Sequence, residues 1–277
     1  MGQAPEHGLR VAVTALLGVS LVSVNTLLMG AVGGGLSVAL QDRLGPGALL
    51  AVQLVPVSVG FLALALLFPP PRGTFGRPLR RRHWLTIPVG MLALSAALDA
   101  CLELLGAQGG ALEEIQRAVL STPLAGRLLL VVATAAFPAL GEEAFFRGTI
   151  LGRAGLSEAG IALSAVLFGL AHFDAWQSPA AALMGIYLGF MALLTRSLWP
   201  GIVAHAFNNG LFTLAPQLGD ELPNGAVALV GFLVAGAVLV FEAVSATGGA
   251  HDGLAALRPT DAGDRGPGPG PEPPQLG

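Results

Sequence analysis

Two adjacent glutamates inside a long apolar run are the residues of this chain best suited to chemistry. Residues 141–147 read Gly-Glu-Glu-Ala-Phe-Phe-Arg, with apolar residues before and after them. A charged side chain deep in a bilayer costs roughly 2.5–3.5 kcal/mol on insertion scales, so an intramembrane ionisable residue indicates function by default. A carboxylate in such a place can act as a general base or as a ligand.

Helical geometry predicts different roles for the two glutamates. Neighbouring residues on a helix point about 100° apart, whereas residues four apart share a face. We therefore expect Glu143 to pair with Arg147. Glu142 then points elsewhere and stays free to act as a base or a ligand.

Two histidines and an asparagine stand in later apolar segments. His172 ends one of them, while His205 and Asn209 lie one helical turn apart in another. Each group has a simpler structural explanation when taken alone: an ion pair that clamps a helix, a core histidine, or an amide that joins helices. Together, in consecutive segments, they predict a polar pocket inside an apolar bundle.

The composition excludes several classes of protein. Hydrophobic residues make up 53% of the 277 residues and charged residues 11%, and the mean hydropathy is +0.72, which argues against a soluble single-domain enzyme. The single cysteine, Cys101, excludes an internal disulfide framework and a cysteine-rich metal site. Basic patches with interleaved aromatic residues are absent, so a nucleic-acid partner is not expected.

The elements that must position these side chains are membrane helices. A hydrocarbon core of about 30 Å needs roughly 20 apolar residues for each spanning helix. The chain offers about eight such runs, which predicts an all-α polytopic membrane helix bundle. These runs are 11–40, 48–68, 84–105, 127–147, 159–173, 180–194, 201–214 and 225–244.

We divide the chain into three parts. Residues 1–127 form an N-terminal three-helix membrane region, 128–248 a catalytic membrane core, and 249–277, rich in Gly, Pro and Asp, a disordered C-terminal tail. Asp99, Glu103 and Glu242 stand near predicted helix ends, so we expect them to be solvated at the interface.

The arginines predict the orientation. The chain has no lysine, and five of its fourteen basic residues fall within 72–82. Short cytoplasmic loops carry excess positive charge, so this loop and, with eight spans, both termini should be cytoplasmic. The all-arginine, Gly/Pro/Ala-rich composition suggests a GC-rich bacterial genome, and hence a multi-pass protein of the bacterial cytoplasmic (inner) membrane.

Three motifs, taken in order, resemble one family. Glu142-Glu143-x-x-x-Arg147, Phe168-x-x-x-His172 and His205-x-x-x-Asn209 stand on successive hydrophobic segments. The trio resembles the CPBP (Abi) family of intramembrane proteases, which groups CAAX prenyl endopeptidases with bacteriocin-processing and self-immunity proteins. The resemblance covers roughly residues 128–212.

The resemblance implies a role for each motif residue. Glu142 would activate a water for attack on a peptide carbonyl, with His172 as a base partner or ligand. Glu143 and Arg147 would hold the local geometry, and His205 with Asn209 would stabilise the oxyanion. The substrate would be a membrane-bound peptide or protein, reached from the cytoplasmic side, and the bilayer would be the other partner.

Three questions stay open at this point. A divalent metal such as zinc would take Glu142, His172 and His205 as ligands, but the HExxH spacing of soluble zinc proteases is missing and a glutamate-activated water needs no metal. The substrate could be prenylated or could carry a leader. The alternative function is a non-catalytic membrane scaffold or immunity protein, or a proton-coupled transporter that uses the Glu/His pocket.

Overall fold

The protein is a bundle of membrane-length and shorter helices, as the composition predicts. The computed structural model describes residues 3–107, 111–214 and 223–256, and these form helices, turns and loops without a strand. The helices are α1 (Gln3–Leu40), α2 (Pro46–Leu67), α3 (His83–Leu104), α4 (Ala111–Leu120), α5 (Leu124–Val131), η1 (Val132–Ala136), α6 (Phe137–Glu142), η2 (Glu143–Leu151), α7 (Gly152–Ala154), α8 (Glu158–Leu170), α9 (Gln177–Thr195), α10 (Trp199–Leu214) and α11 (Asn224–Ala256).

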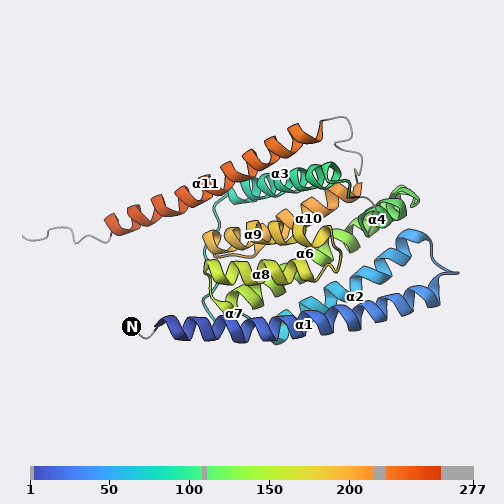
Figure 1. Cartoon of the computed structure of the whole chain (residues 1–277), viewed down its shortest axis with the longest axis horizontal. Coiled ribbons are helices and arrows are strands. Elements are labelled where there is room, and N and C mark those ends of the chain that lie inside the picture. The colour runs from blue at the N-terminus through green and yellow to red at the C-terminus, as the bar shows by residue number, and fades with distance from the viewer. Residues whose placement is uncertain (1–2, 108–110, 215–222, 257–277) are drawn as a thin grey trace, which may run out of the picture.

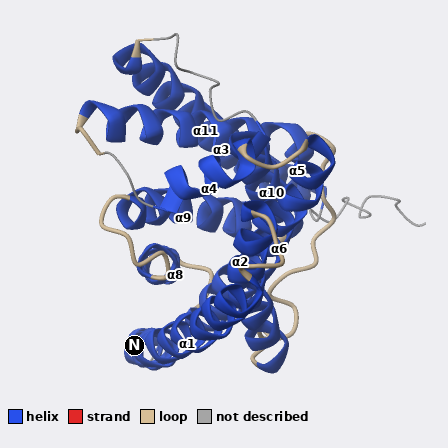
Figure 2. Cartoon of the chain, turned by 90° about the vertical axis from the view of Figure 1, so that its right-hand side faces the viewer, coloured by secondary structure: helices blue, strands red, loops and turns tan. Residues whose placement is uncertain are grey.

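The helices lie in three layers. Figure 1 shows α1 and α2 along one side, α3 and α11 along the other, and α6, α8, α9 and α10 between them. Figure 2, which views the bundle from one end, separates the same groups. The motif residues belong to the middle layer, because Glu142 ends α6 and His205 lies on α10.

Six helical stretches are long and apolar enough to cross a membrane, and α8 is a shorter apolar helix. Each of the eight predicted segments corresponds to a helix or a continuous helical run, which confirms the all-α polytopic class. The amphipathic helix α4 was not expected. Its apolar residues recur at helical spacing and its charged residues fall on the other face, which favours a helix that lies along a surface.

The fourth predicted segment, residues 127–147, belongs to one continuous helical rod, which we call the fourth rod and which contains two π-helical stretches. It runs over residues 126–154 and contains the π-helical stretches η1 and η2. In a π-helix each amide bonds five residues back, and such turns occur frequently at functional sites. The second stretch begins at Glu143, so the two motif glutamates straddle the change from α- to π-helix.

Small residues and aromatic rings hold the middle layer together and pack it against α2. A side chain at Gly141 would collide with the backbone carbonyl of Ser58 on α2, and one at Gly169 with that of Ser178 on α9. Such close approaches are typical of membrane helices, whose association depends on packing. Phe61, Phe145 and Phe146 form an aromatic cluster with ring centroids 5.1–5.2 Å apart.

The structure corrects the interpretation of Glu242. Its side chain is only 2% exposed and contacts Thr86, His83 and Arg82 on and just before the first turn of α3, so it is not solvated at the interface. Sequence position near a helix end could not show that α3 covers it.

The predicted division at 127/128 and 248/249 stays a prediction. Helix α11 continues to Ala256, into the first residues of the predicted tail, and residues 257–277 lie outside the described part of the chain.

Candidate functional site

A buried ion pair anchors the site on the fourth helical rod. Arg147 Nη1 donates to Glu143 Oε1 at 2.8 Å, and both side chains are 1% exposed. The predicted pairing is therefore present. The other terminal nitrogen of Arg147 donates to the carbonyl of Gly185 on α9 at 3.3 Å, so this guanidinium ties the rod to its neighbour.

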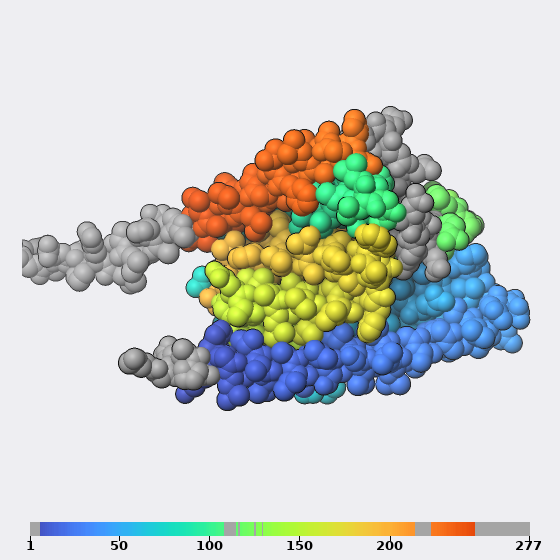
Figure 3. All heavy atoms as spheres, viewed as in Figure 1, coloured from blue at the N-terminus to red at the C-terminus, as the bar shows by residue number. Residues whose placement is uncertain are grey.

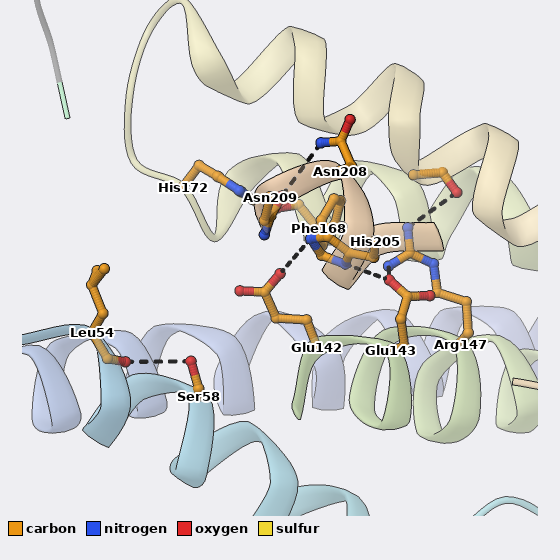
Figure 4. A network of polar contacts seen from close by, with 11 residues as sticks. Leu54, Ser58, Glu142, Glu143, Arg147, Phe168, His172, His205, Asn208 and Asn209 are labelled. Atoms are coloured by element: carbon orange, nitrogen blue, oxygen red, sulfur yellow. Dashed lines mark hydrogen bonds and ion pairs between the residues drawn. The ribbon is translucent and has the colours of Figure 1, made fainter. Parts of the chain in front are cut away.

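His205 lies between the two glutamates (Figure 4). Its Nδ1 is 3.1 Å from Glu143 Oε1, and its Nε2 is 3.8 Å from Glu142 Oε2. We expected Glu142 to point away from the residues that contact Glu143, but the carboxylates of both glutamates face the imidazole of His205. One imidazole can meet both because its two nitrogens lie on different edges of the ring and the turn widens at Glu143.

The two carboxylates differ in how they are partnered. Glu143 accepts from Arg147 and faces His205, and its side chain is 1% exposed. Glu142 keeps 17% of its side chain exposed, and within the described part of the chain its one ion-pair contact is the 3.8 Å approach to His205. Glu142 is therefore the carboxylate that can still bind a water or a substrate.

Phe168 connects the charged residues. Its ring lies under the Arg147 guanidinium, with the guanidinium carbon 4.4 Å from the ring centroid. The rings of His172 and His205 meet it edge-on, at centroid distances of 5.0 and 5.9 Å. A cation over an aromatic face is stabilised further when it is desolvated, as here. The motif includes Phe168, but its packing role was not predicted.

His172 lies in the turn after α8 and is exposed. Its Nδ1 is 2.9 Å from the carbonyl oxygen of Phe168. Because a carbonyl can only accept, this nitrogen carries the proton, and the neutral ring then has its lone pair on Nε2. No hydrogen bond or ion pair within the described residues joins His172 to Glu142.

Two neighbouring asparagines stand one turn beyond His205. Asn208 is 4% exposed and its Nδ2 donates to Asn209 Oδ1 at 3.4 Å, while Asn209 is half-buried. In Figure 4, Asn209 and His172 lie on the Glu142 side of His205, away from Arg147. The bond uses the oxygen of Asn209, and no hydrogen bond among the described residues uses its amide nitrogen, which can therefore donate to a ligand. Adjacency in sequence was the only signal for Asn208.

The predicted metal ligands do not form a cluster. Among the residues that the structure describes, no three His, Cys, Asp or Glu side chains lie where they could hold a metal ion. Glu142 and His205 approach each other, but His172 stands apart and faces a backbone carbonyl. The three residues therefore do not fit a metal as a set, and zinc or another divalent metal stays a prediction of the sequence.

A glutamate that faces a histidine between apolar helices, with a second histidine in the turn after α8, is an arrangement that a hydrolase could use. Residues 124–211, less than half of the chain, match the family described as Type II CAAX prenyl endopeptidase Rce1-like. The match contains all three motifs and confirms the resemblance to the CPBP family for this part of the chain. No curated protein and no solved structure matches the chain.

Proposed function

We propose that the protein is an intramembrane endopeptidase that hydrolyses a peptide bond of a membrane-associated substrate with a water activated by Glu142. The observation that carries this proposal is the unequal partnering of the two glutamates. Glu143 is buried and bound to Arg147, whereas Glu142 is part-exposed and lies 3.8 Å from a single imidazole nitrogen. The family match supports endopeptidase activity in general terms.

In the proposed reaction the Glu142 carboxylate takes a proton from a water as the water oxygen attacks the peptide carbonyl carbon. The attack forms a C–O bond and a tetrahedral oxyanion, and collapse of this oxyanion breaks the C–N bond. Glu142 then returns the proton to the departing amine. General acid–base catalysis of this kind contributes about 10²–10⁴-fold to the rate.

His205 and Asn209 are the proposed donors to the oxyanion. Glu143 holds His205 Nδ1 at 3.1 Å, so Nε2 is the nitrogen that faces the pocket, and when protonated it can donate. Asn209 offers its amide nitrogen, because its oxygen accepts from Asn208. A preorganised donor to an oxyanion is typically worth about 10²–10³ in rate.

His172 is proposed to orient the water. Its Nδ1 proton is directed to the Phe168 carbonyl, which leaves Nε2 as an acceptor. A water that donates to both Glu142 and His172 would have a lone pair directed at the substrate. This role needs no direct contact between the two residues, and none is described.

The substrate proposal is a membrane-bound peptide, prenylated or leader-bearing. It is tested by comparing peptide termini in membranes of cells that carry the wild-type protein or the Glu142→Ala variant. Fragments that disappear with Glu142→Ala and persist with Asp42→Asn, an exposed carboxylate in the turn between α1 and α2, identify substrates. If both variants give the wild-type fragments, the endopeptidase proposal is wrong.

A further inference from the structure

The loop between α2 and α3, residues 68–82, concentrates positive charge at one end of the bundle. It holds five of the fourteen basic residues of the chain, all arginine, and no acidic residue. Four of the five are exposed: Arg72, Arg77, Arg80 and Arg81. Among the described residues, only the fifth, Arg82, has an ion pair, with Glu242. Four guanidinium groups of this loop therefore have no carboxylate of the described chain as a partner.

The loop crosses the end of the bundle. Figure 1 shows it running from α2 in one outer layer to α3 in the other, past the ends of the helices of the middle layer. In Figure 3 part of the loop, in cyan, lies at the surface of the left-hand end. The exposed arginines are thus presented at this end of the protein.

Contacts with the middle layer hold the loop in place. Gly76 N donates to the carbonyl of Arg196 at 2.8 Å, just after α9. A side chain at Gly152 of α7 would lie 2.8 Å from Pro70 Cβ. Phe75 packs against a cluster of three buried residues, Leu151, Ile161 and Ala192. A charge signal for membrane insertion needs only the arginines, whereas these contacts fix where the loop lies on the folded bundle.

Three more arginines join the loop in what we call the arginine-rich end: Arg10, Arg153 and Arg196. Arg153 Nε donates to the Phe68 carbonyl at 3.4 Å, and a side chain at Gly155 would lie 3.6 Å from Arg10 Nη1. The eight arginines of this end face only four acidic residues on the helices that begin or end there, Glu6, Glu158, Glu242 and Asp252. The chain beyond residue 256, outside the described part, adds three acidic and two basic residues, so the excess of positive charge remains.

Position along the chain places these arginines at a membrane surface. Arg82 directly precedes α3 and Arg196 directly follows α9, and both helices are long and apolar enough to cross a membrane. Trp84 and Trp199 stand two and three residues further along the chain. Tryptophan is enriched where a bilayer meets water, at the level of the lipid headgroups. The same level of the protein therefore carries the arginines and the expected headgroups of one leaflet.

We propose that the arginine-rich end binds the headgroups of anionic phospholipids through Arg72, Arg77, Arg80 and Arg81. A guanidinium group can donate two parallel N–H groups to one phosphate. Clusters of about four to eight basic residues next to a membrane span are typical of binding to anionic lipids. A free phosphate ion offers the same oxygens, but nothing confines it to the level of the tryptophans. This inference does not depend on the proposed function.

Tryptophan fluorescence tests lipid binding at this end. The chain has three tryptophans, and Trp176 precedes α9 at the opposite end. The Trp176→Phe background keeps Trp84 and Trp199, which are 45% and 59% exposed. The protein is reconstituted in mixtures of phosphatidylglycerol and phosphatidylcholine in which one of the two has brominated chains, which quench tryptophans that they contact. Comparison of the two series gives the preference for the anionic lipid at the arginine-rich end.

We expect a preference of about fivefold for phosphatidylglycerol, because a basic residue near an anionic surface contributes roughly that factor. Arg80→Gln/Arg81→Gln should bring the preference close to one. The described hydrogen bonds of these two residues use only their backbone atoms, so the fold should survive. Arg72→Gln/Arg77→Gln is the second variant, with the same expected loss, and it decides the question if the first does not fold.

Arg43→Gln/Arg117→Gln is the matched control, since it removes two exposed arginines near the opposite end and should keep the preference. Equal quenching by the two lipids in the parent protein overturns the proposal, and so does an unchanged preference in a folded loop variant. A loss in the control as large as in the loop variants shows that net charge alone attracts the lipid, which also overturns it.

Salt distinguishes a lipid headgroup from a free anion. Sodium chloride and sodium phosphate at the same ionic strength should weaken the preference equally, since both act by screening. A much stronger effect of phosphate would assign the arginines to the free ion and overturn the lipid proposal. None of these measurements uses cleavage, so their outcome is separate from that of the proposed function.

Discussion

His205 Nδ1 lies 3.1 Å from Glu143 Oε1, which joins two motifs that are 62 residues apart in sequence. The same carboxylate oxygen accepts from Arg147 Nη1 at 2.8 Å. Arg147, Glu143 and His205 thus form a chain that fixes the plane of the imidazole and leaves its Nε2 toward Glu142. The orientation of His205 therefore depends on the Glu143–Arg147 pair, which does not itself face the open part of the pocket.

Glu143→Ala should destabilise the protein strongly, because it leaves the buried Arg147 guanidinium without its carboxylate. Removing one partner of a buried pair typically costs about 3–5 kcal/mol. The loss is measured by unfolding in detergent micelles. The double variant Glu143→Gln/Arg147→Met, which removes both charges, should recover part of that loss. A Glu143→Ala protein as stable as the wild type would contradict the importance of the pair.

Phe168→Leu should reduce cleavage by the folded protein, because it removes the aromatic face from Arg147 and the ring edges that position both histidines. Aromatic pairs contribute about 0.5–1.5 kcal/mol beyond the area that they bury. Phe207→Leu is the matched control, since Phe207 is 53% exposed on α10. Equal cleavage rates for the two variants, at equal amounts of folded protein, would show that Phe168 only fills space.

Gly141→Ala should push α6 away from α2, because the added methyl group meets the Ser58 carbonyl. Glu142 is the next residue, so both stability and cleavage should fall. Overpacking of this kind typically costs about 1–3 kcal/mol. Gly34→Ala provides the comparison, since a side chain there has nothing within 4 Å. Thermal unfolding and cleavage assays of both variants decide this, and an unchanged Gly141→Ala protein would refute the close contact.

Glu242→Ala should loosen α11 from α3 while cleavage by the folded protein is retained. The carboxylate accepts from Thr86 Oγ1 at 2.7 Å and lies 3.3 Å from His83 Nε2, so its loss leaves buried polar groups without a partner. An unsatisfied buried group costs about 1–3 kcal/mol. Glu103→Gln, at an exposed hydrogen bond to Asn224, should change stability little. A larger effect of Glu103→Gln on the unfolding midpoint would contradict the burial of Glu242.

Much of the fold could be predicted because a membrane restricts the choices. Apolar runs of about 20 residues have to form helices, since unpaired backbone groups are too costly in lipid. The pairing of Glu143 with Arg147 followed from their spacing of four. Local periodicity carries this information, and it needs no knowledge of tertiary contacts.

The rest depended on contacts between distant segments. The burial of Glu242 required the position of α3, and the approach of both glutamates to one ring required the wide turns that start at Glu143. The exposure of His172 depended on α8 ending after 13 residues, beside the middle of α1. The pattern of hydrophobic residues in the sequence does not show at what depth in the bundle a short helix such as α8 ends.

The most direct test of the central claim is the rate at which purified protein cleaves a substrate peptide when Glu142 is replaced by Gln. The amide keeps the shape of the side chain but cannot accept the proton of the water. We expect a loss of about 10² or more in kcat, as for removal of a general base, with unfolding unchanged. A Glu142→Gln protein that cleaves at the wild-type rate would contradict the account.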